Sequence, residues 1–168
     1  MFSSNILTAL ATLATTTNAL YFHLSPFVAT DIRIPSESHA LSFTISNPDA
    51  VFEQGGSAPR NCSITWSGEN SSPPTCFTEC SDAGYPYFAR ICPGSYNYAG
   101  DFSLEILEYY IYKNSALNNA TLTLKEGEDG YACSRGGQST VCTFQNDGYG
   151  VDTGLETRYS VMYPENVC

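Results

Sequence analysis

The stretch from Ala40 to Ser46, Ala-Leu-Ser-Phe-Thr-Ile-Ser, decides the fold class of this chain. Its apolar residues Leu41, Phe43 and Ile45 alternate with polar neighbours. Successive side chains of a β-strand point to opposite faces, so this alternation predicts a strand with one buried and one solvated face. A helix would place apolar residues every three or four positions, and no such stripe with capping residues follows residue 19.

The same period of two recurs along the chain. Phe102, Leu104 and Ile106 alternate within 101–112, and we expect at most one helical turn in 108–119. Other strands are expected at 21–34, 62–66, 85–91, 120–125, 141–144 and 155–163. Asp-Gly pairs at 129–130 and 147–148 suit hairpin turns. The pattern predicts a single all-β domain, an antiparallel β-barrel or β-sandwich stapled by disulfides.

Composition excludes several classes of partner. The 168 residues include 17 acidic and 7 basic side chains, which gives a net charge of −10. Nucleic-acid binding needs clustered Lys or Arg, and an anionic membrane surface also attracts basic segments, so neither partner is expected. Only 14% of the residues are charged, against roughly 25% in an average domain. An apolar fraction of 42% is enough to build a core.

The first 19 residues, which carry no charged side chain, read as a secretory signal peptide. The apolar stretch from Ile6 to Ala14 has the length of a signal-peptide core and is too short to span a bilayer. Small residues before the junction place cleavage after Ala19, and a frayed N-terminal arm is the alternative. We expect residues 20–168 to form one all-β domain that is secreted and extracellular.

Seven cysteines, all after residue 19, predict disulfides in an exported chain. Three N-glycosylation sequons agree with export, at Asn61, Asn70 and Asn119, of which Asn70 is the most favourable. Seven is odd, and the terminal Cys168 is the natural candidate for a free thiol or for a disulfide-linked homodimer. A clamp that ties down the C-terminus while another cysteine stays free is equally open.

Several short motifs occur in a characteristic order. They are Leu41–Pro48 (LSFTISNP), Asn61–Trp66 (NCSITW), Cys80–Asp82 (CSD), Phe102–Ile106 (FSLEI), Ala120–Leu124 (ATLTL), Tyr131–Cys133 (YAC) and Val141–Cys142 (VC). This order resembles the small secreted β-barrel proteins of filamentous fungi typified by the Alternaria major allergen. The resemblance covers most of residues 20–168, and each motif alone is short. It implies a compact antiparallel fold, no cofactor and an extracellular location.

The resemblance also implies disulfide pairing. The pairs it implies are Cys62 with Cys80 and Cys133 with Cys142, which leaves Cys76 and Cys92, outside the family's pattern, to pair with each other. The second pair is also expected from local physics, because eight residues containing Gly136 and Gly137 separate its cysteines in a predicted hairpin.

The sequence offers little catalytic chemistry. His23 and His39 lie in no metalloprotease or nucleophile-elbow motif, so we interpret both as surface or structural residues. The spacing of Cys76 and Cys80 would suit zinc, but thiols in an oxidising compartment form disulfides first. We therefore expect no metal and no cofactor.

Paired carboxylates are the remaining route to an enzyme, because glycosidases need only two. Glu105 and Glu108 are three residues apart on one predicted strand, so they point to opposite faces. Glu126, Glu128 and Asp129 cluster at a predicted turn, where carboxylates mainly favour solubility. The expectation is a protein that is not an enzyme.

Twelve tyrosines are the unusual feature of the composition. Most suit strands, because tyrosine packs well on a sheet and keeps one polar end. A binding surface is most plausible around Cys92, where stapled loops would carry Tyr85, Tyr87, Tyr96 and Tyr98.

The sequence therefore predicts a secreted, disulfide-stabilised fungal protein that acts by binding. By resemblance it is an effector or allergen-like protein, and its partner is an extracellular host defence protein. The alternative is a secreted carbohydrate-binding module or a small glycoside hydrolase with paired carboxylates. A third reading is a cell-wall protein cross-linked through Cys168.

Overall fold

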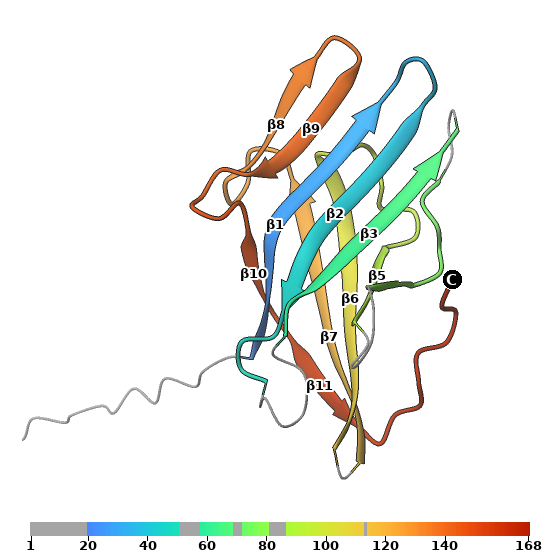
Figure 1. Cartoon of the computed structure of the whole chain (residues 1–168), viewed down its shortest axis with the longest axis vertical. Helices are drawn as coiled ribbons and strands as arrows, with labels where there is room; N and C mark the ends of the chain where they lie inside the picture. Colours follow the sequence, from blue (N-terminus) through green and yellow to red (C-terminus); the bar gives the residue numbers. More distant parts are fainter. Residues whose placement is uncertain (1–19, 51–57, 69–71, 81–86, 113) are drawn as a thin grey trace, which may run out of the picture.

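Two antiparallel sheets form the molecule. The computed structural model describes residues 20–50, 58–68, 72–80, 87–112 and 114–168, and Figure 1 shows how their strands are arranged. One sheet has the order β3-β2-β1-β9-β8, with β10 beside the start of β1. Its strands are β1 (Tyr21–Ile32), β2 (Ser38–Ser46), β3 (Arg60–Ser67), β8 (Tyr131–Gly136), β9 (Ser139–Phe144) and β10 (Val151–Gly154). The other sheet has the order β11-β7-β6-β5-β4. Its strands are β4 (Thr78–Cys80), β5 (Tyr87–Ile91), β6 (Asp101–Tyr112), β7 (Asn114–Lys125) and β11 (Glu156–Tyr159).

The all-β prediction is confirmed, and the architecture is a sandwich. Among the described strands, no hydrogen-bonded ladder joins an edge of one sheet to an edge of the other, so the barrel does not close. The region 108–119, where we expected at most a helical turn, belongs to the long hairpin of β6 and β7. The short strands β4 and β10 were not predicted, because three or four residues carry too little alternation to detect.

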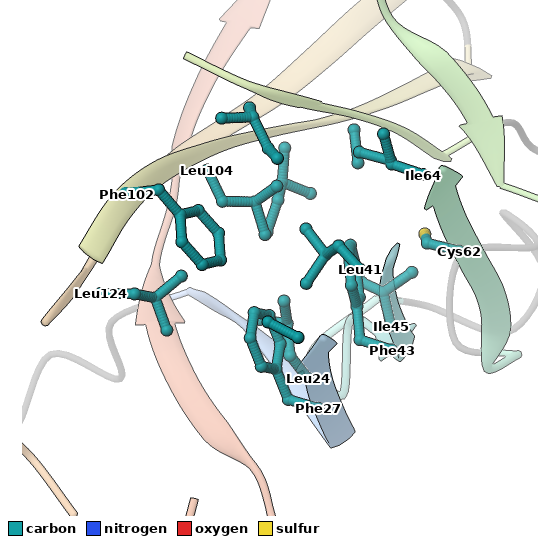
Figure 2. Close-up of a cluster of buried hydrophobic side chains, with 14 of the residues drawn as sticks. Leu24, Phe27, Leu41, Phe43, Ile45, Cys62, Ile64, Phe102, Leu104 and Leu124 are labelled. Carbon is teal, nitrogen blue, oxygen red and sulfur yellow. The ribbon is translucent and has the colours of Figure 1, made fainter. Parts of the chain in front are cut away.

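The core lies between the sheets, where the predicted apolar rows meet. Leu41, Phe43 and Ile45 of β2 are at most 3% exposed, and Phe102 and Leu104 of β6 are as deeply buried. Figure 2 shows these side chains converging from opposite sides of the sandwich. The alternation in β2 thus identified its buried face correctly.

A bulge in β1 changes which residues of this strand face the core. Leu24 pairs with Ile45 and Phe27 with Phe43, so β1 has one residue more than β2 across this interval. Pro26 lies in the bulge, where a residue without an N–H group costs no ladder hydrogen bond. Even-numbered residues face inward before the bulge and odd-numbered ones after it, which turns Asp31 toward the interior.

The C-terminal segment 160–168 does not continue as a strand. The strand expected at 155–163 ends at Tyr159. The chain then runs to β4, where Cys168 N–H donates to Phe77 O and Phe77 N–H donates to Asn166 O, both at 2.8 Å. Val167 packs on a second apolar cluster that contains Phe77. We call residues 160–168 the C-terminal strap.

Three disulfides join the described cysteines. They are Cys62–Cys80, Cys133–Cys142 and Cys76–Cys168. The first two confirm the expected pairs, and three disulfides indicate an oxidising environment such as the extracellular space.

The predicted pair of Cys76 with Cys92 is wrong. Cys92 is the free cysteine, and Cys168, expected to be free or to bridge two chains, is bonded within its own chain. The reason is tertiary: the strap lies parallel to the residues just before β4 and brings Cys168 beside Cys76 across 92 positions of sequence. The open alternative of a C-terminal clamp describes this arrangement.

Candidate binding site

A row of polar and aromatic residues crosses the inner face of the first sheet near one end. Asp31 of β1 is the register partner of His39 in β2, and His39 is the partner of Trp66 in β3. This is the end where β1 stops and β2 and β6 begin, at the top of Figure 1. Three neighbouring strands therefore place these side chains side by side between the sheets.

Asp31 is the centre of this row. It is 9% exposed and accepts hydrogen bonds from His39 Nδ1 at 2.7 Å, from Ala99 N–H at 2.8 Å and from the Tyr96 hydroxyl. Such a buried carboxylate is stable because three donors replace its lost hydration. Burial and the bond to Asp31 raise the pKa of Tyr96, so this hydroxyl stays protonated and keeps donating.

The rings pack in a fixed arrangement. His39 stacks on Trp66 with 4.9 Å between ring centroids and 11° between planes. Tyr96 stands at 85° to both rings, 4.9 Å from Trp66 and 5.8 Å from His39. Edge-to-face contacts of this kind add to the stabilisation from burial and fix ring orientation. Tyr96 is therefore held by its ring contacts as well as by its hydroxyl.

The loop between β5 and β6 that carries Tyr96 is tied down along its length. Ser95 N–H donates to Cys92 O at 3.0 Å, and Gly94 adopts a φ of +76° in this turn, a conformation that favours glycine. Ala99 is held from two sides, since its N–H binds Asp31 and its carbonyl accepts the Tyr131 hydroxyl at 2.6 Å. Side chains on this loop are thus presented by a rigid support.

A cavity of about 450 Å³ opens beside this row. It is lined by Glu37, His39, Ser72, Pro73, Thr75, Ile91, Cys92, Pro93, Gly94, Tyr96 and Asn97. Glu37 is the acidic residue among them, and its Oε1 lies 3.6 Å from His39 Nε2, longer than a hydrogen bond. The imidazole of His39 therefore stands between two carboxylates, with Asp31 behind it and Glu37 at the opening. Both sheets and the loop before β6 contribute to this pocket, which we call the end pocket.

The end pocket contains elements of a nucleophilic site without their assembly. Cys92 is unpaired, but its thiol forms none of the side-chain hydrogen bonds found in the described residues. Burial and the nearby Glu105 raise the pKa of Cys92, so the unreactive thiol form is favoured. Within the described residues, no group of three or more His, Cys, Asp or Glu is arranged to hold a metal ion.

The four predicted surface tyrosines are not brought together. Tyr96 lines the end pocket. Tyr98 points elsewhere and donates to Glu126 Oε2 at 2.9 Å. Tyr87 is 1% exposed because the alternation of β5 turns it inward with Ile91, so its assignment to a binding surface is wrong. Tyr85 lies outside the described residues.

The candidate carboxylates do not form an open catalytic pair. Glu105 and Glu108 lie on opposite faces of β6, as predicted: Glu105 binds Arg90, and Glu108 is 1% exposed. Glu126 is engaged by Arg135 and Tyr98. Of the turn residues, Glu128 pairs with Lys125 at 3.2 Å.

The predicted glycosylation sites differ in their surroundings. Asn61 is exposed on β3 and accepts a hydrogen bond from Thr44 Oγ1 at 2.8 Å. Asn119 lies on β7 and is half-buried, with its amide 3.3 Å from Glu105 Oε1. Asn70 falls outside the described residues. Asn61 therefore has the more open surface of the two.

Sequence reasoning missed most of the pocket. His39 was interpreted as structural or surface, and Asp31, Glu37 and Trp66 were not singled out. The hairpin register of β1 and β2 would have opposed Asp31 to His39. The face they share depends on the bulge at Pro26, which alternation alone does not indicate. The other histidine, His23, forms an exposed pair with Asp152 at 2.6 Å.

Comparisons with protein-family models, with curated proteins and with solved structures found no match. The described part of the chain contains no helix long and apolar enough to cross a membrane. The end pocket and its surroundings are therefore the basis for inferring what the chain does.

Proposed function

We propose that this chain acts outside the cell as a disulfide-stabilised binding protein without catalytic activity, and that the end pocket is its contact site. The observation that carries the proposal is the rigid support of a solvent-accessible cavity. Asp31 holds His39, Tyr96 and Ala99 at once, so the wall is fixed before anything binds. A preorganised wall lowers the entropy cost of binding.

The chemistry of the pocket supports binding over catalysis. A nucleophile would need a base within hydrogen-bond reach, and the Cys92 thiol forms no bond with His39 in the described structure. A glycosidase would need a sugar between its two carboxylates. Here the His39 ring fills the space between Asp31 and Glu37, so the nearest carboxylates of the pocket are bridged by protein.

The finer identity rests on the resemblance. We propose that the protein belongs with the secreted fungal group typified by the Alternaria major allergen, that residues 1–19 direct its export, and that its partner is an extracellular host defence protein. The supporting facts are the order of the short motifs and the pairs Cys62–Cys80 and Cys133–Cys142. This makes the chain an effector or allergen-like protein.

The test is to fill the pocket and measure the loss of partner binding. Thr75 is exposed and lines the cavity, so Thr75→Trp should block it with little effect on folding. Gln145→Trp, at an exposed site after β9, is the matched control. Extracellular host fluid is passed over each immobilised protein, and retained proteins are identified by mass spectrometry.

We expect a partner that the wild type and Gln145→Trp retain and that Thr75→Trp loses at least tenfold. Equal retention by all three proteins would contradict the pocket as contact site. Selective retention of chitin, glucan or cellulose in parallel pull-downs would replace the protein partner with a carbohydrate.

A further inference from the structure

The electrostatics of the end pocket are negative whatever the protonation state of its histidine. Asp31 and Glu37 together contribute two negative charges, and His39 between them contributes either none or one positive charge. The three side chains therefore sum to −2 or −1. A bound group that is positively charged is attracted in both cases.

Protein cations do not neutralise this site. The residues that line the pocket include neither lysine nor arginine. Among the described residues, the partner of Glu37 within ion-pair range is His39, at 3.6 Å. Arg33 lines a neighbouring hollow that shares Glu37, yet it forms no ion pair with that carboxylate in the described structure. With a net charge of −10 on the whole chain, long-range attraction also favours a cation over an anion.

The shape of the lining restricts the cation further. Pro73, Ile91 and Pro93 supply apolar wall, while Glu37 and Asn97 supply oxygen atoms. Asn97 Nδ2 donates to Asp101 Oδ2 at 2.7 Å, which fixes the amide and leaves its carbonyl oxygen as an acceptor. A primary ammonium has three N–H donors and no acceptor, and an alkyl stem can lie along apolar wall. This combination fits an alkylammonium group better than a bare metal ion.

We infer that the end pocket binds a primary alkylammonium group, the chemistry of a lysine side chain or of a free alkylamine. The inference rests on the proposed binding function and names the group that the pocket selects. The ammonium lies against Glu37, and the alkyl stem contacts Ile91 and the prolines. Cys92 remains a neutral thiol at the wall and does not compete for the proton.

The experiment is an NMR titration of the full chain, observed through backbone amides, with three ligands of equal length. They are n-butylammonium, n-butanol and butyrate. We expect butylammonium to shift amides of residues 37–39 and 91–97 in a saturable way, at least tenfold more tightly than butanol and without detectable butyrate binding. Raising the salt concentration should weaken butylammonium alone, because screening acts on the charged ligand.

Two variants separate the local carboxylate from the overall charge. Glu37→Gln should weaken butylammonium at least tenfold, while Glu165→Gln, the same change at an exposed position of the strap, should leave it unchanged. Unaltered amide spectra outside the pocket confirm folding of each variant. A lysine peptide that binds more tightly than butylammonium identifies a protein side chain as the source, and equal or weaker peptide binding identifies a free amine.

Equal binding of butanol and butylammonium, or full binding by Glu37→Gln, would overturn the ammonium inference. Absence of any titration would also overturn it. The proposed function would stand in each of these cases if Thr75→Trp still lost its partner. That function fails separately if filling the pocket changes nothing.

Discussion

Glu108 shows how one residue can be an acid in sequence and a core residue in structure. It is 1% exposed, and its Oε2 accepts from Asn47 Nδ2 at 2.8 Å and from Asn118 Nδ2 at 2.6 Å. The Tyr87 hydroxyl donates to the same carboxylate. Burial raises the pKa of Glu108, and the three hydrogen bonds oppose the rise only in part. The folded protein therefore holds this proton more tightly than the unfolded chain does.

The sign of this shift predicts the pH dependence of stability. A raised pKa gives a contribution that is complete below the unfolded value of about 4.5 and is lost as pH rises toward the folded value. The Glu108→Gln variant lacks this titration. We expect its free energy of unfolding to improve relative to the wild type as pH rises from 4.5 to 7.

Urea unfolding of both proteins at several pH values measures this difference. Subtracting the two curves removes the titration of all other groups, which both proteins share. A difference that does not change between pH 4.5 and 7 would contradict the raised pKa. Glu128→Gln, at an exposed turn position, serves as a control and should show no such trend.

At the scale of elements, the strap is the feature that ties the second sheet to the end of the chain. Its backbone pairs with Phe77, and the Cys76–Cys168 bond closes a loop across 92 positions of sequence. Val167 adds apolar contact to the cluster of Phe77, Phe88 and Leu107 on that sheet. The entropy of closing a long loop in the unfolded chain makes such a bond stabilising.

Removal of the strap disulfide should therefore cost more than removal of the hairpin disulfide. The double variant Cys76→Ser, Cys168→Ser should lower the free energy of unfolding by about 2–4 kcal/mol. The variant Cys133→Ser, Cys142→Ser opens a loop with a separation of only 9 and should cost less. Denaturant unfolding under non-reducing conditions measures both. A larger loss in the hairpin variant would contradict the role given to the strap.

At the scale of the whole molecule, disulfides and low charge density work together. The net charge of −10 is spread over a surface in which only 14% of all residues are charged. Three disulfides restrain the unfolded chain, and the apolar core between the sheets supplies the main burial energy. This combination suits a protein that must persist in an oxidising environment without chaperones.

The disulfide map predicts the thiol chemistry of the intact molecule. Alkylation after unfolding, without reductant, should label one thiol per chain, and peptide mapping should place it at Cys92. On a non-reducing gel the protein should run as a monomer, because Cys168 is bonded to Cys76. Reduction before alkylation should label all seven cysteines. A label on Cys168 without reduction, or a dimer that reductant dissolves, would contradict this pairing.

Alternation predicted the parts of the fold that depend on local sequence. The buried face of β2, the opposite orientation of Glu105 and Glu108, and the tight hairpin at Asp129 and Gly130 follow from the period of two and from turn chemistry. The candidate site was predicted only through Tyr96. Its carboxylate and histidine were missed, because Asp31 turns inward only after the bulge at Pro26.

The sequence by itself determined an all-β, disulfide-bonded chain of high negative charge, since these properties depend on composition and on neighbours in sequence. The tertiary structure alone decided that Cys168 pairs with Cys76, that Glu108 is buried, and that Asp31, His39 and Tyr96 meet at one pocket. Each of these contacts joins residues whose distance in space depends on how two sheets pack. Many chain paths satisfy the same local pattern, and packing selects one of them.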